Sequence, residues 1–300
     1  MYFVGDRRNV PRWVVKQPDV AASQEDLPSP IDATQECAAL VRLFAHFSSH
    51  APELRVPRPI ALLPEVGAFA MEYVHGRDVA QFIGTRALAG PQKLLHAMAL
   101  AARFVKHLHA IDGVRAQPVD LGPKAETALA FADEAMAPLG LALPRKVSRA
   151  LANVPQRLLP ASLCRLHGDF APVNVFIDPC GSAVGIDPRL DRIGYPEEDL
   201  ARFLTMFATE RWFVATQAVE ATNRLRVRAE SALLAGYYGC VGASPLLELC
   251  RIDALTRRWV RREAARQRGR PVFGSARARV VDAHFRALLI ESARRLNELL

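Results

Sequence analysis

The chain has 300 residues, half of them hydrophobic, and a formal net charge of +8 at pH 7. This length and apolar content suit one large domain or two lobes with a buried core, and they exclude a disordered chain. No uninterrupted run of about 18 apolar residues occurs, and the start lacks the apolar segment of a signal peptide, so neither a spanning helix nor secretion is predicted.

Cysteine use and charge indicate the compartment and the possible partners. The five cysteines are odd in number and scattered, without a Cys-x-x-Cys pair, so we predict no zinc site or disulfide and a cytoplasmic location. Residues 201–300 hold eighteen arginines, no lysine and nine acidic residues, a net charge of +9. Such a stretch could bind an anionic surface or simply solvate helix faces. We favour solvated faces and expect no nucleic-acid partner; the oligomeric state is not indicated.

The first predicted elements are a hairpin and a helix. Segments 2–4 and 12–16 have the apolar, β-branched character of strands, and Lys16 ends the second one, from which its ammonium group could reach phosphates. A polar link containing prolines follows. A helix is then predicted over 34–47, capped by Asp32 or Thr34.

Two more strands, 56–63 and 68–74, flank a Pro-Glu-Val-Gly turn, and His75-Gly76-Arg77 ends the pattern. A helix is predicted over 91–109 from its apolar spacing. The segments beyond it read as a loop at 111–124, a helix at 125–138, and a helix at 141–159 broken at Pro155.

Residues 164–187, CRLHGDFAPVNVFIDPCGSAVGID, carry the densest group of candidate functional residues. Two apolar runs flank Pro179-Cys180-Gly181-Ser182, which predicts a β-hairpin with a four-residue loop. In this register Asn174 lies opposite Asp187 at the open end of the hairpin. Asp169 lies five residues before Asn174. Two oxygen ligands and an offset carboxylate suit a magnesium-phosphate site with a hydroxyl-orienting base.

The remainder of the chain reads as helix. A loop is predicted over 189–194 and a helix over 196–209, where Pro196 suits the first turn because its missing N–H costs no hydrogen bond there. Further helices are predicted to residue 300, with breaks near Gly236, Gly239, 242–245 and 269–274.

The motifs together resemble those of the aminoglycoside phosphotransferase and choline kinase-like family of small-molecule kinases. They are His167-Gly168-Asp169 with Asn174, then Ile186-Asp187, then Gly194-Tyr195-Pro196-Glu197-Glu198-Asp199-Leu200-Ala201. The resemblance covers most of the chain and is sharpest over 164–203. It implies an α+β, protein-kinase-like fold of two lobes, with residues 1–74 as a small, truncated N-terminal sheet lobe and 75–300 as a larger, mainly helical lobe.

The resemblance also implies ATP and Mg²⁺ as cofactors and gives roles to single residues. Asp169 would accept the proton of the acceptor hydroxyl, and Asn174 and Asp187 would bind magnesium. Lys16, oriented by Glu36 in the first turn of the predicted helix, would hold the nucleotide phosphates.

The remaining implied roles concern the nucleotide base and the shape of the loop. Main-chain groups from Glu72 to Val74 would bind the adenine edge. Asp199 would bond main-chain N–H groups of the 167–170 loop, and His167 would fix the same loop.

Two features depart from the family pattern. Few residues precede the Lys16 strand, so the usual first strand and glycine-rich phosphate-covering loop are shortened or absent, with Gly5 alone available for the turn. Asp187 is followed by Pro188-Arg189, a form that resembles the ketosamine kinase branch and leaves metal binding intact.

We therefore predict an ATP-dependent O-phosphotransferase acting on a small-molecule hydroxyl. Because the C-terminal helices carry +9, a polycationic acceptor is disfavoured, and a neutral or anionic compound such as a sugar, sugar phosphate or glycolipid fits better. The short N-terminal region leaves a pseudokinase or nucleotide-binding partner protein as an alternative. A basic module that binds a peripheral anionic surface is the third.

Overall fold

The computed structural model describes residues 2–5, 11–17, 32–51, 53–240, 244–269 and 275–300. The turn that the sequence predicts after Gly5 falls on residues 6–10, and most of the polar link falls on 18–31, so both lie outside the described residues.

Short apolar segments form a four-stranded antiparallel sheet near the N-terminus. Its order is β1 (Tyr2–Gly5), β2 (Pro11–Lys16), β5 (Ala68–Glu72) and β4 (Pro59–Leu63). Gly67, with φ 58°, closes the turn between β4 and β5 in the left-handed region that glycine tolerates. The predicted hairpin and the strand pair after it are therefore confirmed.

Helix α1 (Ala33–His50) packs against β4 and β5. The Asp32 side chain caps it by accepting a hydrogen bond from the Gln35 N–H at 2.7 Å, which decides between the two predicted caps.

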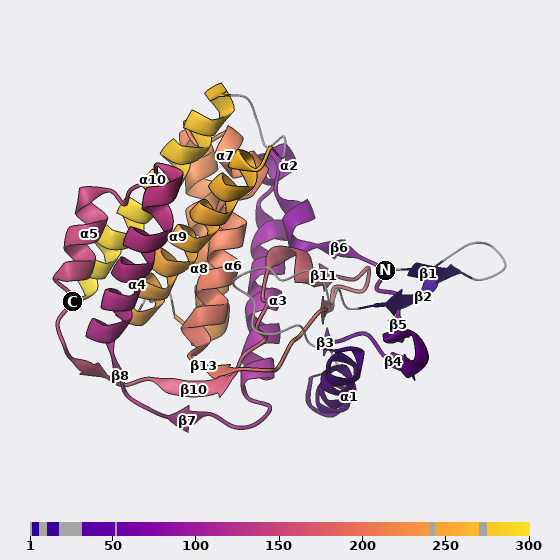
Figure 1. Cartoon of the computed structure of the whole chain (residues 1–300). Coiled ribbons are helices and arrows are strands. Elements are labelled where there is room, and N and C mark those ends of the chain that lie inside the picture. The colour runs from indigo at the N-terminus through magenta and orange to yellow at the C-terminus, as the bar shows by residue number, and fades with distance from the viewer. Residues whose placement is uncertain (1, 6–10, 18–31, 52, 241–243, 270–274) are drawn as a thin grey trace.

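A second small sheet lies between the N-terminal sheet and the helices (Figure 1). Its order is β3 (Leu54–Arg55), β12 (Ala183–Gly185), β11 (Val175–Ile177) and β6 (Arg77–Asp78). Gly185 faces Phe104 of α3 (Gln92–His109), where a Cβ would lie 2.0 Å from the ring, so glycine lets β12 lie against α3. Phe104 in turn stacks on Phe47 of α1, with centroids 5.1 Å apart. One continuous core thus joins the N-terminal sheet to α3.

The register of the central hairpin differs by one residue from the prediction. Val175 pairs with Gly185, and Asn174 pairs with Ile186 rather than Asp187. The Asp178 side chain explains the shift: its Oδ1 accepts hydrogen bonds from the N–H groups of Cys180 and Ser182, both at 2.9 Å, and closes a tighter turn.

Helix α8 (Glu220–Tyr238) packs along α3 and continues through Gly236, where the sequence predicted a break. A Cβ at Gly236 would lie 2.9 Å from the Ala102 Cβ, so this glycine permits close helix packing rather than ending the helix. The helix ends at Gly239, with φ 79°, as predicted.

Most of a second apolar core comes from α4 (Leu121–Met136), α5 (Arg145–Ala152), α9 (Pro245–Gln267) and α10 (Ser275–Leu299). The first core takes up α2 (Thr85–Ala89) and most of α6 (Pro196–Ala208), and α7 (Arg211–Ala215) contributes to both. The helix predicted over 141–159 is reduced to α5, and α4 begins inside the predicted loop 111–124. Short strands complete the fold: β7 (Arg115–Ala116), β8 (Val119–Asp120), β9 (Leu158–Leu159), β10 (Ser162–Arg165) and β13 (Ile193–Gly194).

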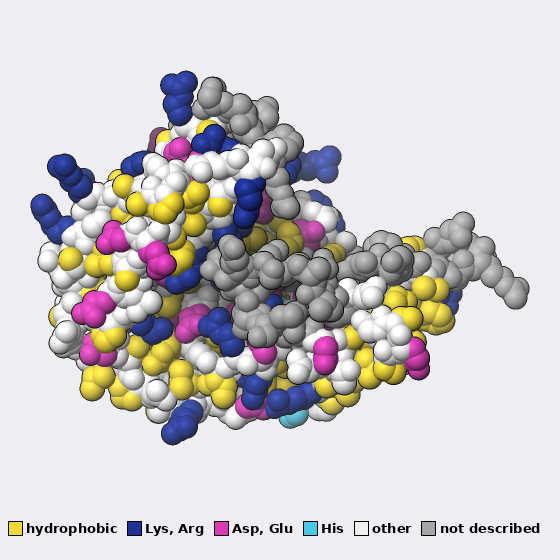
Figure 2. Space-filling view, in the orientation of Figure 1, with side chains coloured by type: hydrophobic (Ala, Val, Ile, Leu, Met, Phe, Trp, Pro, Cys, Tyr) yellow, Lys and Arg dark blue, Asp and Glu magenta, His cyan; other side chains and the backbone are white. Residues whose placement is uncertain are grey.

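The predicted fold class is confirmed, because a sheet-rich N-terminal region is followed by a mainly helical C-terminal part (Figure 1). None of the described helices has the length and apolarity that crossing a membrane requires. Lys and Arg side chains project from many separate points of the helical part in Figure 2, which agrees with solvated helix faces on this side of the molecule.

Candidate active site

The loop between β10 and β11 is held by a buried carboxylate on the first turn of α6. Asp199 accepts hydrogen bonds from the His167 N–H at 2.6 Å, the Gly168 N–H at 3.2 Å and His109 Nε2 at 3.0 Å. Burial alone would raise the pKa of Asp199, but the His109 hydrogen bond and the neighbouring His167 hold it below its ordinary value. The carboxylate therefore stays ionised and fixes the loop backbone.

Asp169 emerges from this loop just after Gly168, whose φ of 82° gives the backbone its sharp turn. The Asn174 amide Nδ2 donates to the Asp169 carbonyl at 2.8 Å and to its Oδ2 at 3.3 Å. On the other side, Arg202 of α6 donates through Nε to Oδ1 at 3.0 Å and also through its second nitrogen. Two elements thus orient one carboxylate.

Lys16, at the end of β2, brings a second pair of predicted residues together. Its ammonium group pairs with Glu36 of α1 and lies 2.8 Å from Asp187 Oδ1. Burial acts to lower the pKa of Lys16, but the attraction of Asp187 and Glu36 outweighs it and raises that pKa above its ordinary value. Asp187 itself has a left-handed φ of 57°, unusual for a non-glycine residue, so the chain leaves the strand direction here.

His167 is fully buried beside this loop, and its Nδ1 accepts a 3.3 Å hydrogen bond from the Asp169 N–H. Burial lowers its pKa, so the ring is neutral and serves the loop's shape rather than proton transfer. Its Nε2 finds no hydrogen-bond partner within the described ranges.

The oxygen donors on either side of the hairpin suit magnesium. Asn174 uses its amide nitrogen to bind Asp169, which leaves its Oδ1 available, and Asp187 contacts Lys16 through only one carboxylate oxygen. Hard oxygen ligands of this kind are what Mg²⁺ takes from proteins. No group of three or more His, Cys, Asp or Glu side chains in the described part of the chain is spaced to hold a metal by itself, so nucleotide phosphates would have to complete the shell.

The residues predicted to bind the adenine edge line a small cavity of about 90 Å³ formed with Arg55 and Asp178. The Glu72 N–H already donates to the Arg58 carbonyl at 2.9 Å, and the Tyr73 N–H donates to the Arg12 carbonyl at 2.9 Å. Of the segment from Glu72 to Val74, the main chain of Val74 is therefore the better candidate for base recognition.

Sequence reasoning missed Arg202. The spacing could have predicted it, because Arg202 follows Asp199 by three residues on one helix, and residues at this spacing share a face. A helix whose Asp199 grips the loop backbone must therefore direct residue 202 toward the same loop.

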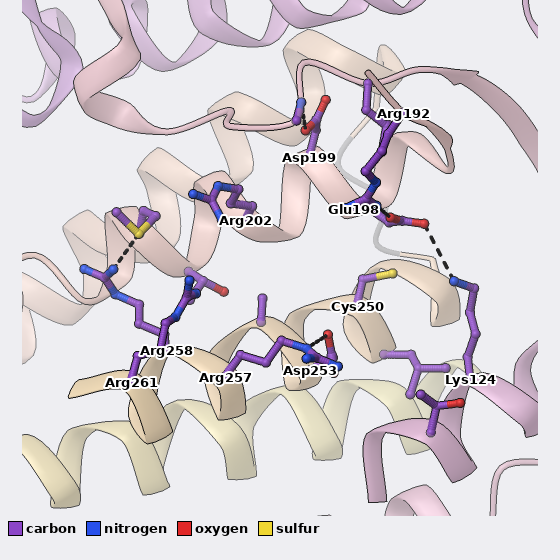
Figure 3. Close-up of a pocket in the computed structure, with 17 residues that line it drawn as sticks. Lys124, Arg192, Glu198, Asp199, Arg202, Cys250, Asp253, Arg257, Arg258 and Arg261 are labelled. Carbon is purple, nitrogen blue, oxygen red and sulfur yellow. Dashed lines mark hydrogen bonds and ion pairs between the residues drawn. The ribbon is translucent and has the colours of Figure 1, made fainter. Parts of the chain in front are cut away.

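A cavity of about 480 Å³ opens beside the loop, between α6 and α9. Gly168 is among its lining residues, and Arg202 on α6 faces the arginines of α9 across it (Figure 3). The arrangement therefore links Asp169 through Arg202 to an arginine-lined hollow. Through Asn174, whose carbonyl accepts from the Ile186 N–H, it links Asp169 to the chain that carries Asp187 and its lysine partner.

The comparisons with known proteins agree with this architecture. The sequence model of the Phosphotransferase enzyme family (APH) matches residues 1–239. The chain therefore belongs to this family of phosphotransferases, as its motifs predicted. No curated protein matched the sequence directly.

Solved structures share the fold at low sequence identity. A glucosamine kinase aligns with a TM-score of 0.59 and 17% identity over 92% of this chain and 71% of its own. A glucosamine kinase in complex with glucosamine, ADP and inorganic phosphate aligns with a TM-score of 0.57 and 16% identity, over 92% and 72%. An aminoglycoside phosphotransferase from Alicyclobacillus acidocaldarius aligns with a TM-score of 0.55 and 13% identity, over 99% and 90%.

Proposed function

We propose that this protein transfers the γ-phosphoryl group of Mg-ATP to a hydroxyl of a neutral or anionic small molecule. The observation that carries the proposal is the placement of Asp169, which emerges from an anchored loop and contacts Arg202 at a cavity. It also contacts Asn174, whose backbone pairs with Ile186 just before the lysine-bound Asp187. Phosphoryl transfer depends mainly on positioning and charge neutralisation, and this site provides both.

Each residue of the site has a task in the proposed reaction. Asp169, held by Asn174 and Arg202, would orient the acceptor hydroxyl and take up its proton. Lys16, kept protonated by its two carboxylate neighbours, would contact the nucleotide phosphates. Magnesium, when bound, would neutralise charge on those phosphates.

Among the described residues, Asn174 and Asp187 each keep a side-chain oxygen without a partner, and these oxygens would hold the ion. Val74, with Glu72, would border the base. The ADP in the glucosamine kinase complex supports nucleotide use, because that protein shares this fold.

We further propose that residues 1–74 and 75–300 act as the two lobes, with the cavity beside Asp169 as the acceptor site. The scattered cysteines support the cytoplasmic location that we propose.

One observation favours a second candidate, a nucleotide-binding protein without turnover. Arg202 contacts one oxygen of the Asp169 carboxylate through two nitrogens, and Lys16 contacts Asp187 directly. A hydroxyl and a magnesium ion would have to compete with these contacts. The protein would then bind nucleotide and signal through its conformation.

Thermal unfolding with ATP, with and without magnesium, tests the nucleotide site. A ligand at 100 times its dissociation constant stabilises a protein by about 2.7 kcal/mol, a rise of several degrees at this size. We expect a magnesium-dependent rise for the wild type and none for Asp187→Ala. A rise without any ADP formation across a broad acceptor panel would favour the second candidate, and no rise at all would contradict both.

A further inference from the structure

The cavity beside Asp169 is unusually rich in cationic side chains. It holds about 480 Å³ between α6 and α9, and Figure 3 shows its charged residues at two ends. Lys124, Arg192 and Glu198 lie at one end, whereas Arg202 and the α9 arginines lie at the other. The six cationic residues that line it are Lys124, Arg192, Arg202, Arg257, Arg258 and Arg261, against the carboxylates Glu198, Asp199 and Asp253.

Each of the three carboxylates already has partners. Glu198 pairs with Arg192 and lies 3.7 Å from the Lys124 ammonium group. Asp253 accepts from Arg257 at 2.8 Å, and Asp199 is used by the 167–168 backbone. The lining carboxylates are therefore committed at the Lys124 end, at Arg257 or in the loop. Arg202 is paired with Asp169, so the excess of positive charge at the other end centres on Arg258.

Arg258 carries this excess most clearly. Its Nε donates to the hydroxyl of Thr209, the C-cap of α6, and its Nη1 contacts the sulfur of Met206 on α6. Within the part of the chain that the structure describes, no carboxylate lies within ion-pair distance of its guanidinium group, and Nη2 has no hydrogen-bond partner. A half-buried guanidinium with neutral partners and a donor to spare is a favourable place for an anion.

The electrostatic surroundings agree with this geometry. Burial and, after partial compensation by Glu210, the nearby charges of Arg261, Arg262 and Arg202 lower the pKa of Arg258 to about 10. Burial first, and then repulsion from the neighbouring guanidinium groups, makes the charged form of Arg258 costly. A bound anion would relieve the repulsion.

We propose that this end of the cavity binds a phosphate or carboxylate group of the acceptor, so that the substrate is a hydroxyl compound that carries an anionic group. The inference rests on the proposed function, because it assumes that the cavity receives the acceptor. It narrows the neutral or anionic class to the anionic one, and it makes Arg258 a specificity-determining residue.

The helix geometry sets the size of the acceptor. Arg202, which contacts Asp169, and the Arg258 partners Met206 and Thr209 lie four to seven residues apart on α6. At 1.5 Å per residue, the backbone positions on α6 that carry Arg202 and the partners of Arg258 lie about 6–10 Å apart along the helix axis. That spacing matches a hydroxyl and an anion at opposite ends of a single sugar ring or a chain of similar length.

A binding measurement with inorganic phosphate tests the anion site without any turnover. Phosphate is titrated by calorimetry at constant ionic strength into the wild type, Arg258→Met and Arg266→Met. Arg266 is the matched control, because it lies on α9 outside the cavity and is paired with Glu263. Loss of a charge-assisted hydrogen bond to Arg258 should weaken binding about 10- to 100-fold, with the control unchanged. Equal binding by all three proteins, or none by the wild type, would overturn the anion site.

A turnover measurement then tests the substrate class on the wild type. ADP formation is compared for a neutral hexose, the corresponding hexose monophosphate and the corresponding hexuronic acid. We expect kcat/KM to be about 10- to 100-fold higher for an anionic acceptor than for the neutral hexose. Whichever of the two anionic acceptors has the higher kcat/KM identifies the preferred group as phosphate or carboxylate. A preference for the neutral hexose would contradict the proposal.

Variants separate this proposal from the function on which it rests. Arg258→Met should lower kcat/KM for the anionic acceptor and leave the KM for ATP unchanged, whereas Arg258→Lys, which keeps the charge but not the fork, should retain part of the preference. Circular dichroism checks that each variant folds. Phosphate binding that depends on Arg258 without turnover of any acceptor would support the anion site and count against the kinase function instead.

Discussion

The two sides of the 167–174 loop have opposite charge patterns. On one side Lys16 lies between the carboxylates of Glu36 and Asp187, and carboxylate oxygens suit a divalent cation. On the other side the arginines around Arg258 outnumber the carboxylates, which are already engaged. This contrast supports our proposal that the anchored loop separates a metal and nucleotide site from a site for an anionic acceptor, with Asp169 between them.

The largest effect should come from the residue that the two sides share. Asp169→Asn removes the hydroxyl-orienting base and should lower kcat about 100- to 10,000-fold. The magnesium-dependent stabilisation by ATP should persist, because Lys16 and Asp187 are untouched. Asp191→Asn, a nearby carboxylate outside these roles, serves as the control, and near-normal turnover in Asp169→Asn would remove Asp169 from the mechanism.

The second prediction concerns Asp199, the carboxylate that anchors the 167–174 loop between the two sides. Asp199→Ala leaves two buried backbone N–H groups and His109 without their acceptor, which should cost about 3–5 kcal/mol of unfolding free energy. Urea unfolding measures this, with Asp133→Ala on the exposed face of α4 as the control. A loss below about 1 kcal/mol would mean that the loop holds its shape by other contacts.

A matched arginine on the same helix sharpens the contrast with Arg258. Arg251 lies about two turns earlier on α9 and is bound by Glu230, whereas Arg258 has no such partner in the described structure. Burial acts to raise the pKa of Glu230, but Arg251 and Arg226 lower it to about 2. The folded-state pKa is below the unfolded one, so this stabilisation is present above about pH 4.5 and is lost as the pH falls toward 2.

The expected size of that acid effect is about 3 kcal/mol when fully developed. Urea unfolding at pH values from 6 to 3 should show part of this loss of unfolding free energy in the wild type and a smaller loss in Glu230→Gln. The same pH dependence in both proteins would show that other carboxylates dominate the acid response.

The close packing of Gly185 against Phe104, just before Asp187 in the chain, should tolerate no added methyl group. Gly185→Ala would place a Cβ 2.0 Å from the Phe104 ring, which is itself stacked on Phe47. The strand before Asp187 must then shift, at a cost of about 1–3 kcal/mol and with weaker ATP binding. Gly90→Ala, where the nearest atom is 4.0 Å away, is the control. Equal melting temperatures for the two variants would contradict this packing.

The smallest effect is expected for Glu36, which together with Asp187 pairs with Lys16. Glu36→Gln removes one of two carboxylates from Lys16 and leaves Asp187 in place. A change of about 1 kcal/mol, or roughly fivefold in the KM for ATP, should follow with kcat little altered. A collapse of kcat instead would place Glu36 closer to the chemistry than we propose.

Much of the site could be predicted from the sequence because its signals are local. His167, Asp169 and Asn174 lie on one short loop, and Asp199 follows at a spacing that the family resemblance makes specific. The hairpin register was wrong by one residue because the Asp178 side chain closes a tighter turn. Asp187 reaches Lys16 through a left-handed backbone that alternation along a strand does not reveal.

The arginine-lined cavity could not be predicted from the sequence, for a different reason. The sequence shows an excess of arginines after residue 200, but not which of them share a cavity. Pairing decides this: Arg251 is neutralised by Glu230, whereas Arg258 lies against the Met206 and Thr209 side chains of α6. Such a distinction depends on how α6 and α9 pack, which no local pattern encodes.

Product analysis tests the central claim most directly. The wild type and Asp169→Asn are incubated with magnesium and ATP labelled in the γ-phosphoryl group, together with the neutral and anionic acceptors, and the acceptors are examined by mass spectrometry. We expect label on a hydroxyl of an anionic acceptor with the wild type and almost none with Asp169→Asn. Label on no acceptor, or equal labelling by both proteins, would contradict it.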